Sequence, residues 1–329
     1  MLKVFAKMTI SAALLTAATL APAAQLSTEA RTAVPHEVQQ LVVIDYRAMQ
    51  NSTAAMDLRE RVMPPELKQF DEALRKSGLN ENQDVEQLAF ALFRPPATGK
   101  DAAKAASSDS DSNLVTVGIA QGQFPTQDIL ANFRKLKVKP QLVRTNKLYP
   151  LGKTGMVACF VDQSTMVFGA PDAVTKALDA RDGVSPSILT NNAMMDAMRT
   201  IDSESLWSIL DQKGTQTMMK QVLGEAGSVA DFDTVRKRLL ASWYGMDFQH
   251  GVKFDLTLST GDSFAAATIS SLLNAAVVMR KMSGSEAEKQ ALSATSIKSD
   301  SGKLSVHFAT SNGEFTSLLQ SPLFQSMVH

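Results

Sequence analysis

The sequence predicts an α+β fold, with antiparallel sheets, helices packed on one face, and two similar halves. Polar and apolar residues alternate in "KFDLTLS" (253–259) and "KLSVHFAT" (303–310), which is typical of strands in a sheet with one solvated face. The stretches "GQFPTQDIL", "GDSFAAATI" and "NGEFTSLL" each lead from a strand through a turn with an acid into a helix. This repetition indicates a weak internal duplication.

The first half is expected to begin with the β-branched strand "LVVIDYRAM" (41–49), followed by a helical region that ends at Ser77-Gly78. The strands "VEQLAFALFR" and "LVTVGIAQGQF" flank a tract without large apolar residues, which predicts a hairpin with a mobile loop at 97–113. A helix capped by Thr126 and three short strands within 141–170 come next. The last of these strands leads to a helix that starts at Pro171.

The corner "FVDQSTMVFGAPDAVTKALDA" (160–180) has the look of an enzyme loop, because a strand passes through a glycine turn into a helix. Proline at the first helical position loses no hydrogen bond, and an early acid such as Asp172 favours the positive helix end. Asp172 would also repel a phosphate. We therefore interpret the corner as helix initiation and not as an anion site.

The second half is expected to start near residues 185–190, which divides the mature chain into halves at 24–187 and 188–329. Its expected elements are helices at 192–200, 215–223, 228–242, 262–282 and 285–292, strands at 205–212, 248–261 and 303–310, and a last helix from Glu314. The stretch from Ser263 to Met279 contains no charge but is diluted by polar residues. We interpret it as a small-residue helix between a sheet and another layer, and expect no stable membrane span once the signal is removed.

The first residues predict export. Lys3 and Lys7 precede an apolar run from Met8 to Leu20, and a small-x-small pattern follows it. This arrangement is typical of a secretory signal peptide, here residues 1–23, and the run is shorter than the roughly 20 residues of a membrane-spanning helix. The mature protein is expected to be periplasmic or extracellular, with retention of the signal as an anchor as the alternative.

Composition excludes several functional classes. The 33 basic and 33 acidic residues balance and are spread along the chain, so neither a nucleic acid nor an anionic membrane surface is an expected partner. An intramolecular disulfide needs two cysteines, and the chain has one. Cys159 lies in an apolar strand and is predicted to be a buried small hydrophobe.

The sequence carries no recognisable catalytic, cofactor or metal motif. It has no G-x-S-x-G elbow, S-x-x-K, Walker loop or G-x-G-x-x-G. Its histidines, His36, His250, His307 and His329, are scattered without a metal-ligand spacing. In "DSDSN", Asp109 and Asp111 have the spacing of a calcium loop, but the glycine and the final glutamate are missing. We therefore expect no catalytic residues, no cofactor and no metal.

Methionine and large aromatic residues are the remaining candidates for a site. The methionines at 194, 195, 198, 218, 219, 279 and 282 fit either core filling or an adaptable apolar groove. Trp207, Trp243 and Tyr244 are the large anchors that could line such a groove, with burial under helices as the simpler alternative.

Four segments carry a family resemblance. The corner at 160–180, "SESLWSILDQ", "GVKFDLTLSTGDSFAAATISSLL" and "GKLSVHFATSNGEFTSLL" resemble, in that order, a family of uncharacterised exported bacterial proteins. The resemblance covers roughly Val42 to Leu319. It implies a secreted or envelope-anchored α+β protein without an established activity, and it offers no functional residues to transfer.

Three functions remain open. The leading hypothesis is a non-enzymatic exported protein that binds a protein partner or an apolar ligand. The second is a lipid or lipoprotein carrier, in which a curved sheet and the uncharged helix at 263–279 enclose an apolar cavity. The third is a hydrolase whose site comes from distant residues, which a cleft with perturbed carboxylates or histidines would favour.

Overall fold

The computed structural model describes residues 25–63, 65–94, 114–223 and 232–321. The strands are β1 (Val38–Asp45), β2 (Val85–Phe93), β3 (Val115–Gly122), β4 (Gln141–Val143), β5 (Asn146–Pro150), β6 (Val157–Phe160), β7 (Thr165–Gly169), β8 (Leu206–Leu210), β9 (Leu239–Asp247), β10 (Val252–Thr260), β11 (Thr295–Asp300) and β12 (Lys303–Thr310). The helices are α1 (Thr28–Thr32), α2 (Tyr46–Gln50), α3 (Thr53–Val62), α4 (Pro65–Lys76), α5 (Glu81–Asp84), α7 (Thr126–Lys135), α8 (Pro171–Arg181), η3 (Ile188–Thr190), α9 (Asn192–Ile201), α10 (Gln212–Leu223), α12 (Phe232–Arg236), α13 (Ser263–Ser283), α14 (Glu286–Ser293) and α15 (Asn312–Leu319).

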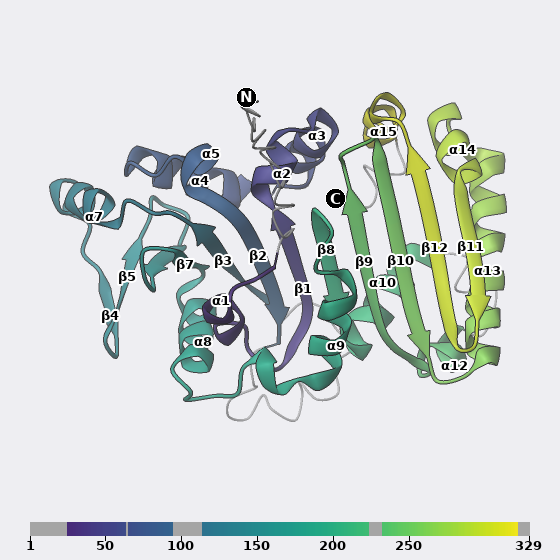
Figure 1. Ribbon diagram of the computed structural model, residues 1–329, viewed down its shortest axis with the longest axis horizontal. Helices are drawn as coiled ribbons and strands as arrows, with labels where there is room; N and C mark the ends of the chain where they lie inside the picture. The colour runs from purple at the N-terminus through teal and green to yellow at the C-terminus, as the bar shows by residue number, and fades with distance from the viewer. Residues whose placement is uncertain (1–24, 64, 95–113, 224–231, 322–329) are drawn as a thin grey trace, which may run out of the picture.

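The described strands form one 12-stranded sheet in the order β11-β12-β10-β9-β8-β1-β2-β3-β7-β6-β5-β4, and every pair in it is antiparallel. The sheet runs across the whole molecule (Figure 1). The predicted α+β class with antiparallel pairing is confirmed.

The topology repeats in the two halves. In each half a first strand is followed by helices and then by two adjacent antiparallel strands. One helix (α7) follows in the first half and two (α13 and α14) follow in the second, and the last strands return to pair beside the third strand. Thus β1-β2-β3-β7 in the first half corresponds to β8-β9-β10-β12 in the second. The two first strands, β1 and β8, pair with each other from Gln40↔Leu210 to Ile44↔Leu206. This pairing joins the halves into one continuous sheet.

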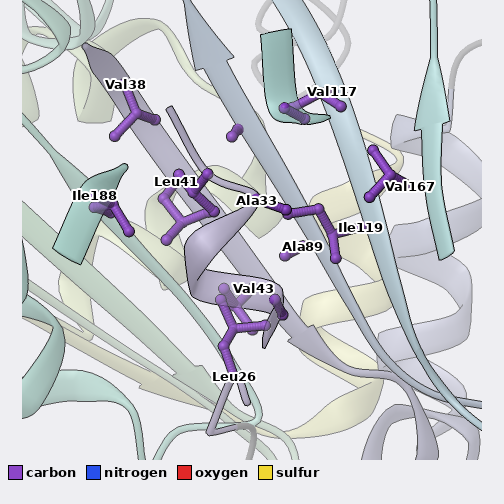
Figure 2. Close-up of a cluster of buried hydrophobic side chains, with 14 of the residues drawn as sticks. Leu26, Ala33, Val38, Leu41, Val43, Ala89, Val117, Ile119, Val167 and Ile188 are labelled. Atoms are coloured by element: carbon purple, nitrogen blue, oxygen red, sulfur yellow. The ribbon is translucent and has the colours of Figure 1, made fainter. Parts of the chain in front are cut away.

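The two faces of the sheet carry different residues because side chains alternate along each strand. One face, here called the α8 face, carries Leu41, Val43 and Ile119 (Figure 2), and its core is covered by α1, α8 and α9. The opposite face, here called the α4 face, carries Val42 and Ile44 and is covered by α3 and α4 over the first half.

Within the part of the chain that the structure describes, helices cover both faces of the first half but only the α4 face of the outer second half. The strands β1 and β2 read "LVVI" and "LAFALF", so they are apolar on both sides and need cover on both. In β10 and β12 the apolar residues face α13 and α15, while Lys253, Asp255 and His307 lie on the open side and are exposed. The prediction that helices pack on one face of the sheet therefore describes the alternating strands of the second half, and not the strands of the first half.

Several predicted elements need correction. The helix expected to reach residue 242 ends as α12 at Arg236, and "LLASWYGMD" forms β9, because its β-branched and aromatic partners in β8 and β10 favour an extended chain. The strand expected at 248–261 begins only at Val252, after a turn with Gly251 at φ +93°. The stretch 141–152 is a hairpin of β4 and β5 that turns at Arg144, with φ 55°. Strand β11 was not predicted.

Two further details concern helix starts. The N-cap of α7 is Pro125 and no side chain caps the helix, so the predicted capping role of Thr126 is wrong. Helix α8 does begin at Pro171 with Asp172 in its first turn, as predicted. The predicted signal peptide at 1–23, the loop at 97–113 and the calcium-like tract lie outside the described residues.

Candidate functional site

A large apolar cavity lies between the α4 face of the sheet and helices α3 and α4. Its volume is about 810 Å³, within the roughly 300–1,000 Å³ that is typical of small-molecule sites. Strands β1, β2, β3, β7, β8 and β9 contribute its floor, and α2, α3 and α4 contribute its cover. Both halves of the chain therefore line the cavity, which lies beside the β1–β8 junction.

The floor of the cavity is less buried than its position in the sheet would suggest. Strand β1 is paired on both edges, so its side chains under α3 and α4 should be fully buried. Instead Val42 and Ile44 are only partly buried, as are Leu88 and Phe90 on β2, while Val43 on the α8 face is fully buried. The helices over the α4 face therefore do not fill the space above these strands.

Small residues and an aromatic wall shape one side of this space. Gly118 and Ala120 on β3 both lie on the α4 face, and both are buried although they carry little or no side chain. The ring of Phe168 on β7 lies over Gly118. Phe168 also stacks on Phe70 of α4, with ring centroids 5.1 Å apart, and meets Phe90 edge-on at 6.0 Å. These aromatic contacts fix the wall.

Methionines from distant parts of the chain line the rest. They are Met49, Met63, Met156, Met166 and Met246. Methionine is unbranched and polarisable, so a wall rich in it adapts to apolar ligands of different shape. None of the methionines that the sequence marks as candidates is among them, because the lining ones are scattered singly and only the fold brings them together.

The charged lining residues of the cavity gather at one end. Arg59 on α3, Asp71 on α4 and Glu81 on α5 lie there with the ring of Tyr46 on α2. The guanidinium of Arg59 pairs with the carboxylate of Glu81 at 2.5 Å, and both side chains are 20% exposed. Its Cζ also lies 5.3 Å from the centroid of the Tyr46 ring, a cation–π geometry. We call these four residues the polar end of the cavity.

Burial shifts the acid–base behaviour of the polar end. Burial raises the pKa of Glu81; the positive charge of Arg59 opposes this shift and the negative charge of Asp71 adds to it. Burial, helped by the negative charge of Glu81, also raises the pKa of the Tyr46 hydroxyl, so that Tyr46 stays a neutral hydrogen-bond donor. Its hydroxyl lies 3.3 Å from Oδ1 of Asn82.

The three aromatic residues predicted to line a groove lie on different sides of the sheet. Trp207 is fully buried on the α8 face, and Trp243 packs partly buried against the same core. Tyr244 lies on the α4 face and lines the cavity. One of the three therefore belongs to the candidate site. Adjacent positions on a strand point to opposite faces, so Trp243 and Tyr244 cannot line one groove.

Other predicted candidates lie elsewhere. Cys159 is buried as predicted, and burial raises the pKa of its thiol. His307 Nδ1 lies 2.8 Å from Oδ1 of Asp255 on the open face of β10 and β12. Within the described ranges, no group of three or more His, Cys, Asp or Glu side chains could hold a metal ion.

Helix α13 does not contribute to the cavity, although the carrier hypothesis places it there. Its residues Ala265 and Ile269 pack against β10 and β12, far along the sheet from β1. The described residues leave its other side uncovered, since Phe264 is 69% and Met282 83% exposed. Among the described helices, α13 is long and apolar enough to cross a membrane, by length and composition alone.

Comparisons with known proteins give a limited likeness. No protein-family model and no curated protein matches the chain. Among solved structures, crystal form I of TP0453 gives a TM-score of 0.48 at 10% sequence identity, over 89% of this chain and 97% of that chain. Crystal form III gives 0.48 at 9%, over 90% and 99%, and crystal form IV gives 0.46 at 8%, over 90% and 98%. Similarity of this extent supports no inference about function, and the resemblance to uncharacterised exported proteins stays a prediction.

Proposed function

We propose that this protein is an exported, non-catalytic carrier that binds an apolar ligand of lipid type in the cavity under α3 and α4. The observation that carries the proposal is the space over the central strands that the described residues leave unfilled, where Val42 and Ile44 remain partly exposed. A single domain gains stability by filling such space, so a retained apolar cavity favours a ligand.

The same observation favours an apolar ligand over a protein partner. A protein interface needs an accessible surface that is rich in large side chains at its centre. The apolar side chains that line the cavity instead lie beneath two helices and on the floor of a sheet. Export is proposed from the N-terminal pattern of Lys3, Lys7 and the run from Met8 to Leu20.

The first experiment is native mass spectrometry of the mature chain, residues 24–329, purified gently after export. We expect a reproducible added mass in the lipid range, released by organic extraction. In parallel, the extracted protein should bind the uncharged fluorophore N-phenylnaphthylamine with an increase in its fluorescence. A clean mass together with no fluorophore binding would overturn the proposal.

A cavity-filling variant makes the test specific. In Val42→Phe the added ring would occupy the cavity from the floor, so we expect at least about a tenfold loss of fluorophore affinity. The matched control is Ala275→Phe, which adds similar bulk at an exposed position of α13. It should leave the affinity unchanged. Equal effects of the two substitutions would place the binding outside the cavity.

A hydrolase is the second candidate, and one observation favours it: Asp71 and Glu81 share a cavity, and the pKa of Glu81 is raised. However, Ser, Cys and His are absent from the described lining residues, and each carboxylate already faces an arginine. Incubation with ester and glycoside amphiphiles tests this candidate. Turnover that Glu81→Gln abolishes would replace the carrier by the hydrolase.

A further inference from the structure

The polar end of the cavity gives information about the ligand itself, provided that the proposed carrier function holds. All charged residues that line the described cavity, Arg59, Asp71 and Glu81, lie at this one end. The remaining lining is apolar except for Tyr46, Thr116 and Tyr244. A ligand that matches this distribution has one polar end and an apolar remainder.

Each carboxylate of the polar end has a guanidinium partner. Arg59 pairs with Glu81 at 2.5 Å, and Arg75, an exposed residue one turn along α4 that does not line the cavity, lies 3.7 Å from Asp71. Counted with Arg75, two guanidinium groups face two carboxylates. A charged head group would add an uncompensated charge to a site whose Arg59 and Glu81 side chains are only 20% exposed, and this is costly at low dielectric.

One hydrogen-bond donor at the polar end has no acceptor. The Nε atom of Arg59 is buried and makes no hydrogen bond to any residue that the structure describes. A buried donor without an acceptor costs free energy, so a ligand oxygen that accepts from it would gain affinity. The neighbouring Tyr46 hydroxyl is a neutral donor and acceptor.

From these observations we infer that the ligand carries an uncharged, oxygen-bearing head of the ester or hydroxyl kind, as in a monoacylglycerol, which accepts a hydrogen bond from Arg59. The head group of a fatty acid anion would be repelled by the carboxylates of Asp71 and Glu81. The head group of a cationic single-chain amphiphile would be repelled by the guanidinium of Arg59. Both classes are therefore disfavoured relative to the neutral head.

The experiment compares three amphiphiles that share one chain: dodecanoate, monododecanoylglycerol and dodecyltrimethylammonium. Each displaces N-phenylnaphthylamine from the mature chain, residues 24–329, below its micellar concentration. We expect the neutral compound to displace the fluorophore at about tenfold lower concentration than either charged one. Equal or better displacement by a charged compound would overturn the inference.

Two variants separate head-group recognition from general hydrophobicity. Arg59→Lys keeps the positive charge but lacks Nε, so the affinity for monododecanoylglycerol should fall about tenfold. Glu81→Gln removes one negative charge, so dodecanoate should gain affinity although its own hydrophobicity is unchanged. No gain for dodecanoate in Glu81→Gln would overturn the charge argument. Failure of the fluorophore to bind the unaltered protein, together with a clean mass in native mass spectrometry, would instead overturn the proposed function itself.

Discussion

The aromatic ring of Phe168 lies directly against the backbone of Gly118, on the neighbouring strand of the sheet. A Cβ atom placed on Gly118 would lie 2.2 Å from Cζ of Phe168, a distance that real atoms do not reach. The two residues are paired across β3 and β7. The absence of a side chain at position 118 therefore determines where the aromatic wall of the cavity stands.

The substitution Gly118→Ala should displace this ring. We expect a loss of about 1–3 kcal/mol in the free energy of unfolding, because the ring must move in a packed wall. The fluorophore affinity should change with it. Gly313→Ala is the control, since a Cβ there meets no atom within 4 Å and the position is helical. It should be neutral or slightly stabilising in denaturant unfolding. Equal losses in both variants would contradict the account.

Phe70 supports the same wall from the helix side. It is 2% exposed and stacks on Phe168. Phe70→Ala should lower the free energy of unfolding by about 3–5 kcal/mol and enlarge the cavity, so that bulkier apolar ligands are accepted. Leu142→Ala, at a site 70% exposed, should cost less than about 0.5 kcal/mol. Calorimetry and fluorophore titration check both. A Phe70→Ala variant as stable as the unaltered protein would show that α4 does not pack there.

The raised pKa of Glu81 predicts a pH dependence of stability. Because burial raises this pKa, the folded state binds more protons than the unfolded state between the ordinary and the raised value. The stability that protonation provides is complete below the ordinary value, about 4.3, and is lost as the pH rises through the raised one. Glu81→Gln lacks this loss, so its stability relative to the unaltered protein should increase with pH.

Glu60 provides a control of opposite sign for this pH dependence. A hydrogen bond from Lys68 lowers the pKa of Glu60, so its stabilisation is present above the ordinary value and is lost as the pH falls. The stability of Glu60→Gln relative to the unaltered protein should therefore decrease as the pH rises. Urea unfolding between about pH 4 and 7 measures both differences. Parallel trends in the two variants would contradict the assignment of the shifts.

Much of the fold could be predicted from local sequence patterns. Strands with clear alternation, such as β10 and β12, and helices with clear boundaries, such as α8 at Pro171, lie close to where periodicity and capping chemistry place them. The first four residues of strand β9 (239–242) were predicted as the end of a helix, because "LLASWYGMD" has no simple alternation. Its extended form depends on partners in β8 and β10 that are distant in sequence.

The sequence could predict the type of candidate site but not most of its residues. An apolar binding region was among the hypotheses. Its residues come from six strands and several helices, so the pattern within any single strand does not reveal them. Tyr244 was identified because it is large and aromatic. Arg59 and Glu81 were missed because ionisable residues at helix positions are ordinary on a surface. They become candidate site residues only because the fold places them in the lining of the cavity that α3 covers.

The continuous sheet predicts that the two halves unfold together. Strands β1 and β8 pair along Gln40–Ile44 and Leu206–Leu210, and one core cluster includes both Val43 and Trp207. Disrupting either half would therefore expose apolar surface of the other, which favours a single cooperative transition. The chain has a reporter on each side. Cys159 is a buried thiol in the first half, and Trp207 and Trp243 are in the second.

Thiol labelling of Cys159 and tryptophan fluorescence should consequently give the same denaturant midpoint. Labelling requires exposure, because burial keeps the thiol protonated and inaccessible. In Val43→Ala, which weakens the core opposite Trp207 at the junction, both midpoints should fall by the same amount. Separate midpoints, or a shift of only one reporter, would mean that the halves are independent folding units and that the cavity beside their junction can open without unfolding either half.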